Sequence, residues 1–328
     1  MGRYVRAVLR DLVGHPQIAL TLLVRDPRAA AAYRDIVGGA VTIAPLRAAR
    51  APRAFDCVWY PWNSMRFGAA APALVTINDD FAFAYPARGW IARRREQRPI
   101  VRAVHAAARI VTISTWSRDA LIERFGLPAA RVSVIPLAPD AFFSPGRQPA
   151  PGVQPFVLAV GAGEERKNIG FLVDVFARAF PRGDVRLVIV GDPGGALRER
   201  IAASALPVDV PAGVDDTTLR GLYRSAAVVT VPSLAEGFGL VAAEAQACGA
   251  AVIAANAGAL PEAVGDAGLL IDPRDARAWE NALRELVYDP AAGAAYRARA
   301  VARWAGASAE RTTQALIAAL ERAVDDRT

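Results

Sequence analysis

Short apolar segments alternate along the chain with longer segments whose apolar residues recur at helical spacing. In several of the apolar segments both faces are hydrophobic, as in strands buried between two layers of helices. The pattern predicts strands over 18–24, 57–60, 73–77, 109–113, 132–135, 156–160, 186–190, 227–231, 251–254 and 268–271. Alternating strands and helices favour parallel sheets with right-handed crossovers. The predicted fold class is therefore α/β, with two doubly wound, Rossmann-like domains.

A stretch rich in Pro and Gly between residues 143 and 155 separates the two sets of strands, and it can hold neither a helix nor a central strand. Helical spacing continues over 276–287 and 309–323, and we expect the C-terminal helices to cross back over the linker. The expected division is an N-terminal acceptor-side domain over 1–145, a linker over 146–155 and a C-terminal nucleotide-sugar domain over 156–328.

The front of the chain departs from the doubly wound pattern. Residues 3–12 predict an amphipathic helix, and the segment 18–24 predicts the strand after it. A doubly wound domain ordinarily opens with a strand and a Gly-rich turn, and neither is found before this helix. We expect the first strand of the N-terminal domain to be missing, either from this chain or from the sheet itself.

Length and composition restrict the class of protein. The chain has 328 residues, of which 53% are hydrophobic and 22% charged, which favours two folded domains and excludes a disordered protein. Two cysteines are too few for a disulfide framework or a cysteine metal site, so a reducing compartment fits. No apolar run reaches the roughly 18 residues of a membrane span, and the first residues do not resemble a signal peptide. We expect a cytoplasmic protein.

Positive charge is concentrated in the first half of the chain. Residues 1–150 hold 21 Arg against 10 Asp and Glu, whereas the whole chain has a net charge of +7. Such an excess draws a protein toward anionic lipid or nucleic acid, although a compositional preference for Arg explains it equally well. Of the 39 basic residues, Lys167 is the only lysine. We expect peripheral contact with an anionic membrane at its inner face, and no nucleic acid partner.

A predicted strand, a glycine-containing turn and a helix follow one another over 227–249. Gly237 and Gly239 allow a ligand to approach the backbone, and a helix that starts near Leu240 directs free N–H groups at the turn. This arrangement favours phosphate binding. Glu244, about one turn into the helix, has the chemistry to accept hydrogen bonds from a ribose diol, whereas Glu236 lies in the turn. The alternative is that both glutamates are ordinary helix-terminus and surface charges.

A second strand and Gly turn, V-G-A-G-E-E-R-K-N, ends with two cations, Arg166 and Lys167. Both turns follow strands of an open α/β sheet, where ligands bind at the carboxyl ends. The two turns and two cations are therefore candidates to converge on one diphosphate. The alternative is that the two cations are surface charges.

The sequence resembles the retaining glycosyltransferases of family 4, which are two-domain enzymes of the GT-B fold. The resemblance is carried by E-G-F-G-L-V-A-A-E with its two glutamates seven residues apart, and by E-A-Q-A-C-G, G-A-L-P-E and V-G-D-A-G-L-L-I-D-P after it. Further similar segments are G-A-G-E-E-R-K-N, L-R-G-L-Y-R-S-A-A, I-S-T-W-S-R-D-A-L and V-I-P-L-A. The similarity covers nearly the whole chain and is strongest over 156–273.

The resemblance implies a role for each matching residue. Arg166 and Lys167 would contact the donor diphosphate and Glu236 the donor sugar, and these three are the predicted catalytic residues. Glu244 would contact the nucleotide ribose. The resemblance also implies that the donor is bound by Gly161, Phe238, Gly239, Leu240 and Asn78. Asn78 stands where the family often has His, and Asn cannot act as a proton shuttle at neutral pH. It is either a sugar contact or a turn residue.

No metal is expected at this site. Cations and N–H groups can stabilise the charge that develops on a departing nucleoside diphosphate. The adjacent acidic pairs Asp79, Asp80 and Asp215, Asp216 do not form an Asp-x-Asp metal motif and are equally well explained as turn or cap groups.

The sequence thus favours a retaining hexosyltransferase, with mannose as one candidate sugar, that uses a UDP- or GDP-sugar donor. Its hydroxyl acceptor would be lipid-linked, in cell-envelope polysaccharide or glycolipid synthesis. Two alternatives remain. One is a catalytically impaired nucleotide-sugar-binding or scaffold protein that lacks the N-terminal acceptor loop. The other is a nicotinamide-dependent dehydrogenase, although Arg166 occupies the third glycine position of the dinucleotide motif.

Overall fold

A computed structural model describes residues 2–26, 28, 30–37, 41–65, 67–146, 154–204 and 206–326. The chain forms two compact units: residues 1–140 with 308–328, and residues 141–307. Residues 147–153 of the expected linker lie outside the described residues. The division differs from the expected one at the C-terminus, because the last helix belongs to the first unit and not to a domain that runs to residue 328.

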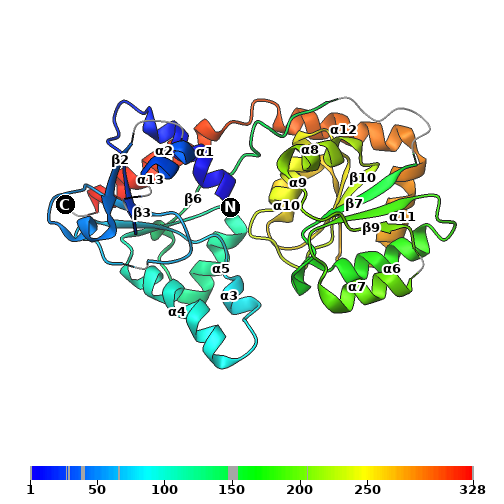
Figure 1. The fold of residues 1–328 in the computed structure, drawn as a ribbon, viewed down its shortest axis with the longest axis horizontal. Coiled ribbons are helices and arrows are strands. Elements are labelled where there is room, and N and C mark those ends of the chain that lie inside the picture. Colours follow the sequence, from blue (N-terminus) through cyan, green and yellow to red (C-terminus); the bar gives the residue numbers. More distant parts are fainter. Residues whose placement is uncertain are drawn as a thin grey trace. The chain divides into compact units, whose positions relative to one another are not determined.

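All strands of the first unit pair in parallel, in two separate sheets (Figure 1). β1 (Thr21–Val24) pairs with β2 (Thr42–Pro45). The second sheet has the order β3-β4-β5-β6, formed by β3 (Val58–Tyr60), β4 (Ala73–Thr76), β5 (Arg109–Thr112) and β6 (Val132–Val134). All four residues of β4 are buried, which matches its position inside the sheet.

Helices surround these two sheets. They are α1 (Gly2–Val13), α2 (Ala30–Val37), α3 (Phe81–Ala84), α4 (Trp90–Ala106), α5 (Thr115–Phe125) and α13 (Ala309–Asp325), with short 3-10 turns at Leu46–Arg50 and Ala129–Arg131. α13 packs against α1 and lies over β4 and β5. Thr312 Oγ1 donates a hydrogen bond to the carbonyl of Pro136 at 2.6 Å, which fixes the helix to the segment after β6. The C-terminal helix is therefore part of the first unit's core.

The second unit contains one parallel sheet with the order β12-β11-β10-β7-β8-β9. Its strands are β7 (Phe156–Val160), β8 (Arg186–Val190), β9 (Val208–Asp209), β10 (Val228–Val231), β11 (Val252–Ala255) and β12 (Leu269–Ile271). The order reverses between β7 and β10, which are neighbours although about 70 residues separate their register partners. The sheet is therefore doubly wound, as predicted.

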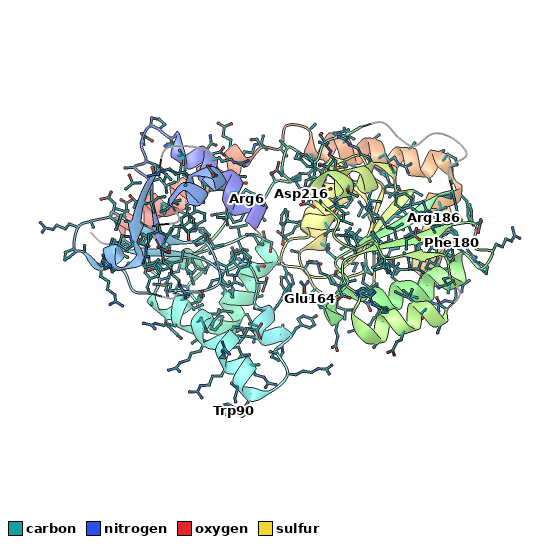
Figure 2. The ribbon with its side chains drawn as sticks, viewed as in Figure 1. Arg6, Trp90, Glu164, Phe180, Arg186 and Asp216 are labelled. Atoms are coloured by element: carbon teal, nitrogen blue, oxygen red, sulfur yellow. The ribbon has the colours of Figure 1, made fainter. Side chains whose placement is uncertain are left out.

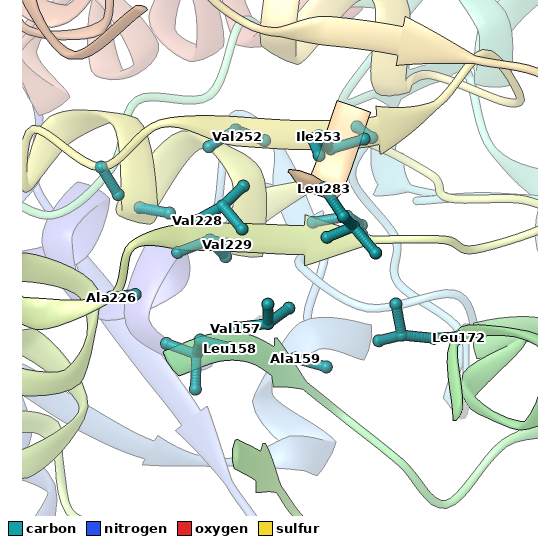
Figure 3. Packing of buried hydrophobic residues seen from close by; sticks show 14 of the residues in the cluster. Val157, Leu158, Ala159, Leu172, Ala226, Val228, Val229, Val252, Ile253 and Leu283 are labelled. Carbon is teal, nitrogen blue, oxygen red and sulfur yellow. The ribbon is translucent and has the colours of Figure 1, made fainter. Parts of the chain in front are cut away.

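Helices of the second unit cover both faces of this sheet. They are α6 (Ile169–Ala179), α7 (Gly194–Ala203), α8 (Asp216–Ser225), α9 (Leu240–Ala247), α10 (Leu260–Val264), α11 (Ala276–Tyr288) and α12 (Pro290–Trp304), with 3-10 turns at Glu165–Lys167 and Gly265–Ala267. Figure 3 shows the core between them, where Val157, Val229 and Ile253 of neighbouring strands pack together and Leu283 of α11 adds a side chain. These side chains are fully buried.

The predicted strands are present, most of them within one or two residues of their expected ends. β7 and β8 match the prediction at both ends, whereas β1 begins at Thr21, three residues later than expected. β2 and β9 were not predicted. Among the described residues, no helix is long and apolar enough to cross a membrane.

Candidate functional site

The candidate site lies at the carboxyl ends of β7 and β10. These strands are neighbours at the point where the strand order reverses, so the loops that follow them open on the same edge of the sheet. The loop after β7 carries Arg166 and Lys167, and the loop after β10 carries Glu236. A direct hydrogen bond of 2.7 Å from the amide of Leu234 to the carbonyl of Arg166 joins the two loops.

Two residues with positive φ shape the loop after β7. Gly161 has a φ of +89° and turns the chain directly after the strand. Asn168 has a φ of +56° and starts α6. Its side-chain amide donates to the carbonyls of Pro232 and Pro273, at 3.3 and 3.2 Å, and so ties three loops together. Arg166 and Lys167 lie in the turn between these two residues.

Glu236 is the centre of a compact polar cluster. Its Oε1 accepts hydrogen bonds from Lys167 Nζ at 2.6 Å and from Ser233 Oγ at 2.8 Å. Its Oε2 accepts one from Arg166 at 3.2 Å. The Glu236 residue is 8% exposed, and a carboxylate so buried requires such partners. The structure therefore brings together the three residues that were predicted to be catalytic.

Arg166 is held on two further sides. Glu164 accepts two hydrogen bonds from the guanidinium, at 2.8 and 3.1 Å, and the carbonyl of Ala235 accepts one at 3.0 Å. Figure 2 labels Glu164 on the loop after β7. Burial by itself lowers the pKa of Arg166, but the carboxylates of Glu236 and Glu164 outweigh this effect and raise the pKa above its ordinary value. The guanidinium is thus a fixed positive charge.

α9 begins at Leu240, as expected, and points its N-terminus into the same loop. Gly239 precedes it with a φ of +100°, and no described side chain caps the helix. The first N–H groups of α9 therefore remain suited to an anion. Phe238, next to Gly239, is buried. Glu244 lies one turn further along and is also buried, and Tyr223 Oη donates a hydrogen bond to its Oε2 at 3.2 Å.

Asn78 belongs to the first unit, where it follows β4. It is 1% exposed, and its Oδ1 has no hydrogen-bond partner within the part of the chain that the structure describes. Its backbone amide donates to Asn63 Oδ1 at 2.8 Å, and its carbonyl accepts from Ser117 Oγ at 2.7 Å. These backbone hydrogen bonds fix the position of Asn78, and its buried Oδ1 can still accept a hydrogen bond.

The adjacent acidic pairs have structural contacts. Asp215 caps α8 by accepting a hydrogen bond from the amide of Thr218 at 2.7 Å. Asp80 forms an ion pair with Arg124 at 2.6 Å, and Asp79 accepts a hydrogen bond from the amide of Phe81 at 3.1 Å. The contacts of Asp215 and Asp79 are those of a cap and a turn group, whereas Asp80 does not cap α3 with its side chain and forms an ion pair instead.

Several residues of the cluster were not predicted from the sequence. Ser233 and Glu164 hold Glu236 and Arg166, and Tyr223 holds Glu244. Gly258 has a φ of +58°, and a Cβ placed on it would lie 2.6 Å from the amide nitrogen of Glu236. The G-A-L-P-E segment, which begins with this glycine, was recognised as a motif, but a contact with Glu236 cannot be read from it.

The two halves of the chain each match a family model. Residues 4–141 match the model described as Glycosyltransferase Family 4, and residues 154–289 match the model described as Glycosyl transferases group 1. Among solved structures, sucrose-phosphate synthase from Thermosynechococcus elongatus has a TM-score of 0.66 and 25% identity, over 92% of this chain and 77% of that one. Anabaena Alr3699/HepE in complex with UDP-glucose has a TM-score of 0.76 and 18% identity, over 98% and 95%. The fold is GT-B.

Curated proteins that are named as glycosyltransferases match much of the sequence. The D-inositol 3-phosphate glycosyltransferase of Kineococcus radiotolerans is 35% identical over 257 residues, which are 68% of this chain and 59% of that protein. The O-antigen chain mannosyltransferase B of Escherichia coli is 30% identical over 275 residues, which are 78% of this chain and 70% of that protein. The matches thus span about 60% of the length of the inositol phosphate relatives. With both halves matched, the chain belongs to the family 4 glycosyltransferases.

Proposed function

We propose that the protein is a retaining glycosyltransferase that transfers a hexose from a UDP- or GDP-sugar to a hydroxyl acceptor. The observation that carries the proposal is the cluster of Arg166, Lys167 and Glu236 beside the N-terminus of α9. This cluster places two fixed cations and a helix N-terminus where ligands of an open α/β sheet bind.

The cluster is suited to hold a diphosphate and to stabilise it as a leaving group. Lys167 has three N–H donors, so it can keep its contact with Glu236 and still bind phosphate oxygens, and the fixed charge of Arg166 lies beside the same carboxylate. When the bond between the anomeric carbon and the phosphate oxygen breaks, negative charge grows on that oxygen, and fixed cations stabilise it. We propose that these cations do the work that other glycosyltransferases give to a metal ion.

Retention follows in this proposal from attack on the face that the diphosphate leaves. The acceptor oxygen forms its bond to the anomeric carbon, and the acceptor proton passes to the departing phosphate oxygen. We assign Glu236 to the donor sugar because the same carboxylate anchors both cations, and Glu244 to the nucleotide ribose. Gly161, Phe238, Gly239 and Leu240 would contribute backbone contacts, and Asn78 a contact to the sugar.

The comparisons support a donor and acceptor of this kind. The names of the relatives refer to an inositol phosphate acceptor and to mannosyl transfer in an O-antigen, and the Anabaena structure contains UDP-glucose. We propose an acceptor of the same chemistry, a sugar or polyol hydroxyl on a phosphate-bearing or lipid-linked molecule of the cell envelope. The second candidate function is a scaffold that binds nucleotide sugars without transferring them.

A panel of nucleotide sugars distinguishes these two functions. We expect one UDP- or GDP-sugar to bind in calorimetry and to be consumed when a lipid-linked oligosaccharide extract is added, with retention visible in the anomeric NMR coupling. Turnover should be unchanged by EDTA. Binding without turnover would favour the scaffold, and binding of NAD alone would contradict both.

Glu244→Gln is expected to weaken the binding of that nucleotide sugar by about tenfold or more, because a charged hydrogen-bond acceptor is lost. The matched control is Glu280→Gln, which changes another glutamate of the same unit, in an ion pair with Arg284. Equal dissociation constants for the two variants would contradict the assignment of Glu244 to the binding site.

We propose that α4 contacts an anionic membrane at its cytoplasmic face. Trp90 and Ile91, at the start of α4, are 72% and 60% exposed, and Figure 2 shows Trp90 at the outer end of the helix. At helical spacing they share one face of α4 with four exposed arginines, Arg94, Arg95, Arg98 and Arg102. This face lines a groove of about 1110 Å³. Apolar anchors within a basic face are typical of helices that bind the surface of a bilayer.

Arg94→Glu combined with Arg98→Glu is expected to lower binding to vesicles that contain phosphatidylglycerol by at least about 30-fold, since each arginine near an anionic surface contributes about 1 kcal/mol and each new glutamate is repelled by it. The measurement is co-sedimentation with anionic and with neutral phosphatidylcholine vesicles. The matched control, Arg182→Glu combined with Arg277→Glu, makes the same charge change at exposed positions of the second unit. Equal losses in both double variants would reject α4 as the contact.

A further inference from the structure

A tyrosine of α8 holds the carboxylate that we assign to the nucleotide ribose. α8 and α9 pack against each other (Figure 1), and the Tyr223 hydroxyl donates a hydrogen bond of 3.2 Å across this contact to Glu244 Oε2. Both residues are buried. Because a carboxylate only accepts hydrogen bonds, the tyrosine is the donor. This hydrogen bond ties the side chain of Glu244 to the core of the second unit.

The ring of Tyr223 is fixed in turn by an aromatic residue of the segment 141–146, with which the second unit begins. The buried Phe143 meets this ring edge to face, with 5.8 Å between the ring centres and 66° between the ring planes. Aromatic pairs prefer this geometry because the positive edge of one ring faces the negative face of the other. The packing therefore limits the orientation of Tyr223 and the position of its hydroxyl.

Two arginines of α8 bind the same segment on either side of its buried aromatic ring. The Arg220 guanidinium lies 4.0 Å from the centre of the Phe142 ring, and it donates to the carbonyl of Phe142 at 3.2 Å. Arg224 lies one helical turn later and donates to the carbonyl of Ser144 at 2.9 and 2.7 Å, and to the next carbonyl at 3.2 Å. These contacts hold the segment against α8 and keep the buried ring in place.

A fixed carboxylate binds a diol more tightly than a mobile one. A glutamate side chain that can rotate about each of its bonds loses conformational entropy when a ligand orders it. Each carboxylate oxygen can accept more than one hydrogen bond, so Glu244 can keep the contact with Tyr223 and still accept hydrogen bonds from ribose hydroxyls. The hydroxyl of Tyr223 should therefore add affinity only for ligands that carry a ribose diol.

We propose that Tyr223 is a positioning residue for the nucleotide ribose: its hydroxyl holds Glu244 in place for the diol, and Phe143 of the segment 141–146 holds its ring. The first residues of the second unit thereby reach the nucleotide site through one aromatic contact and one hydrogen bond. This proposal rests on the proposed function, because the contact of Glu244 with the ribose belongs to that function.

Tyr223→Phe removes one oxygen and keeps the ring, so the packing against Phe143 is retained. The probes are UDP and GDP, together with the forms of each that lack both ribose hydroxyls, and calorimetry gives the dissociation constants. For the nucleotide that binds the unmodified protein, we expect the variant to raise the dissociation constant about five- to tenfold, the effect of one lost hydrogen bond. The form without ribose hydroxyls should bind the variant and the unmodified protein equally.

Tyr288→Phe is the matched control. Tyr288 belongs to α11 of the same unit, and its hydroxyl also donates to a carboxylate, that of Asp184, at 2.6 Å. Neither residue belongs to the proposed site, so this variant should change none of the dissociation constants. In a Glu244→Ala background, Tyr223→Phe should have an effect of less than about twofold, because the carboxylate that it positions is gone.

Phe143→Leu tests the contact between the two rings. Leucine keeps an apolar side chain at this buried position but removes the aromatic edge. We expect the dissociation constant of the same nucleotide to rise about threefold, the worth of one edge-to-face pair, and that of the form without ribose hydroxyls to stay unchanged. A loss that is equal for the two forms would mean that Phe143 supports the fold and not the ribose contact.

Equal affinity of Tyr223→Phe and the unmodified protein for the nucleotide would overturn the proposal. So would an equal loss of affinity for the forms with and without ribose hydroxyls, because a merely structural residue acts on both. In either case the proposed function would stand. If the unmodified protein bound neither UDP nor GDP, the proposed function would fail together with this proposal. Every measurement is one of binding, so none of these outcomes depends on turnover.

Discussion

Replacing Lys167 with alanine is expected to lower kcat by about 10²- to 10³-fold, with a much smaller effect on donor binding. One Nζ proton of Lys167 contacts Glu236 at 2.6 Å, and the other two are available to the diphosphate. Because the leaving phosphate gains negative charge as the bond breaks, a lost cation costs more in the transition state than in the ground state. The measurement is steady-state turnover with the donor identified in the panel.

Two variants control this prediction. Lys167→Arg keeps the positive charge and should recover part of kcat, although the planar guanidinium cannot replace the compact ammonium completely. Arg178→Ala removes an exposed cation of α6 that pairs with Glu280 at 3.8 Å, and it should leave turnover unchanged. If Lys167→Ala retained turnover within twofold of the unmodified protein, our assignment of the leaving-group site would be wrong.

Gly258→Ala is expected to reduce kcat/KM by about 10²-fold, the loss that a displacement of about 1 Å in a catalytic group causes. The new Cβ would lie 2.6 Å from the Glu236 amide nitrogen and 2.8 Å from its carbonyl oxygen, so the backbone of Glu236 must move. The hydrogen bond of 2.9 Å from the Ala259 amide to that carbonyl would be distorted as well. Both cations anchored on Glu236 would then shift.

Gly213→Ala is the matched control for Gly258→Ala. Gly213 has a φ of +65°, close to the +58° of Gly258, but a Cβ there would meet no atom within 4 Å. Both variants carry a backbone cost of about 1–2 kcal/mol for a left-handed conformation, and both should melt at lower temperature. Only Gly258→Ala should lose activity. Similar activity losses in the two variants would show that backbone strain, and not the contact with Glu236, is responsible.

The strands inside the sheets could be predicted from the sequence. The two strands that were not predicted, β2 and β9, lie at sheet edges and lack the pattern of a buried strand. β7 and β8 are apolar on both faces and lie between helices, so burial marks them clearly. β2 ends with Pro45, which cannot donate a ladder hydrogen bond and is tolerated at sheet edges. β9 consists of Val208 and Asp209 alone. Neither segment carries a continuous buried pattern.

For the site, the sequence identified the residues but not their contacts with one another. The glycine-containing turns after β7 and β10 indicated that Arg166, Lys167 and Glu236 lie at the same edge of the second sheet, and the structure places them there. Lys167 and Glu236 are 69 positions apart in the sequence, and they meet because β7 and β10 pair in space. Ser233 and Gly258 act through a hydroxyl and through the lack of a Cβ, and neither property distinguishes them from other serines and glycines in the sequence.

The return of α13 to the first unit has a consequence for the order of synthesis. Residues 141–307 form one continuous unit, so the ribosome delivers all of it before the helix that completes the first unit. Domains generally fold as units, in the order in which they emerge. Here the N-terminal unit emerges first but is completed last, and the apolar face that awaits α13 on β4 and β5 stays open to chaperones while the second unit is translated.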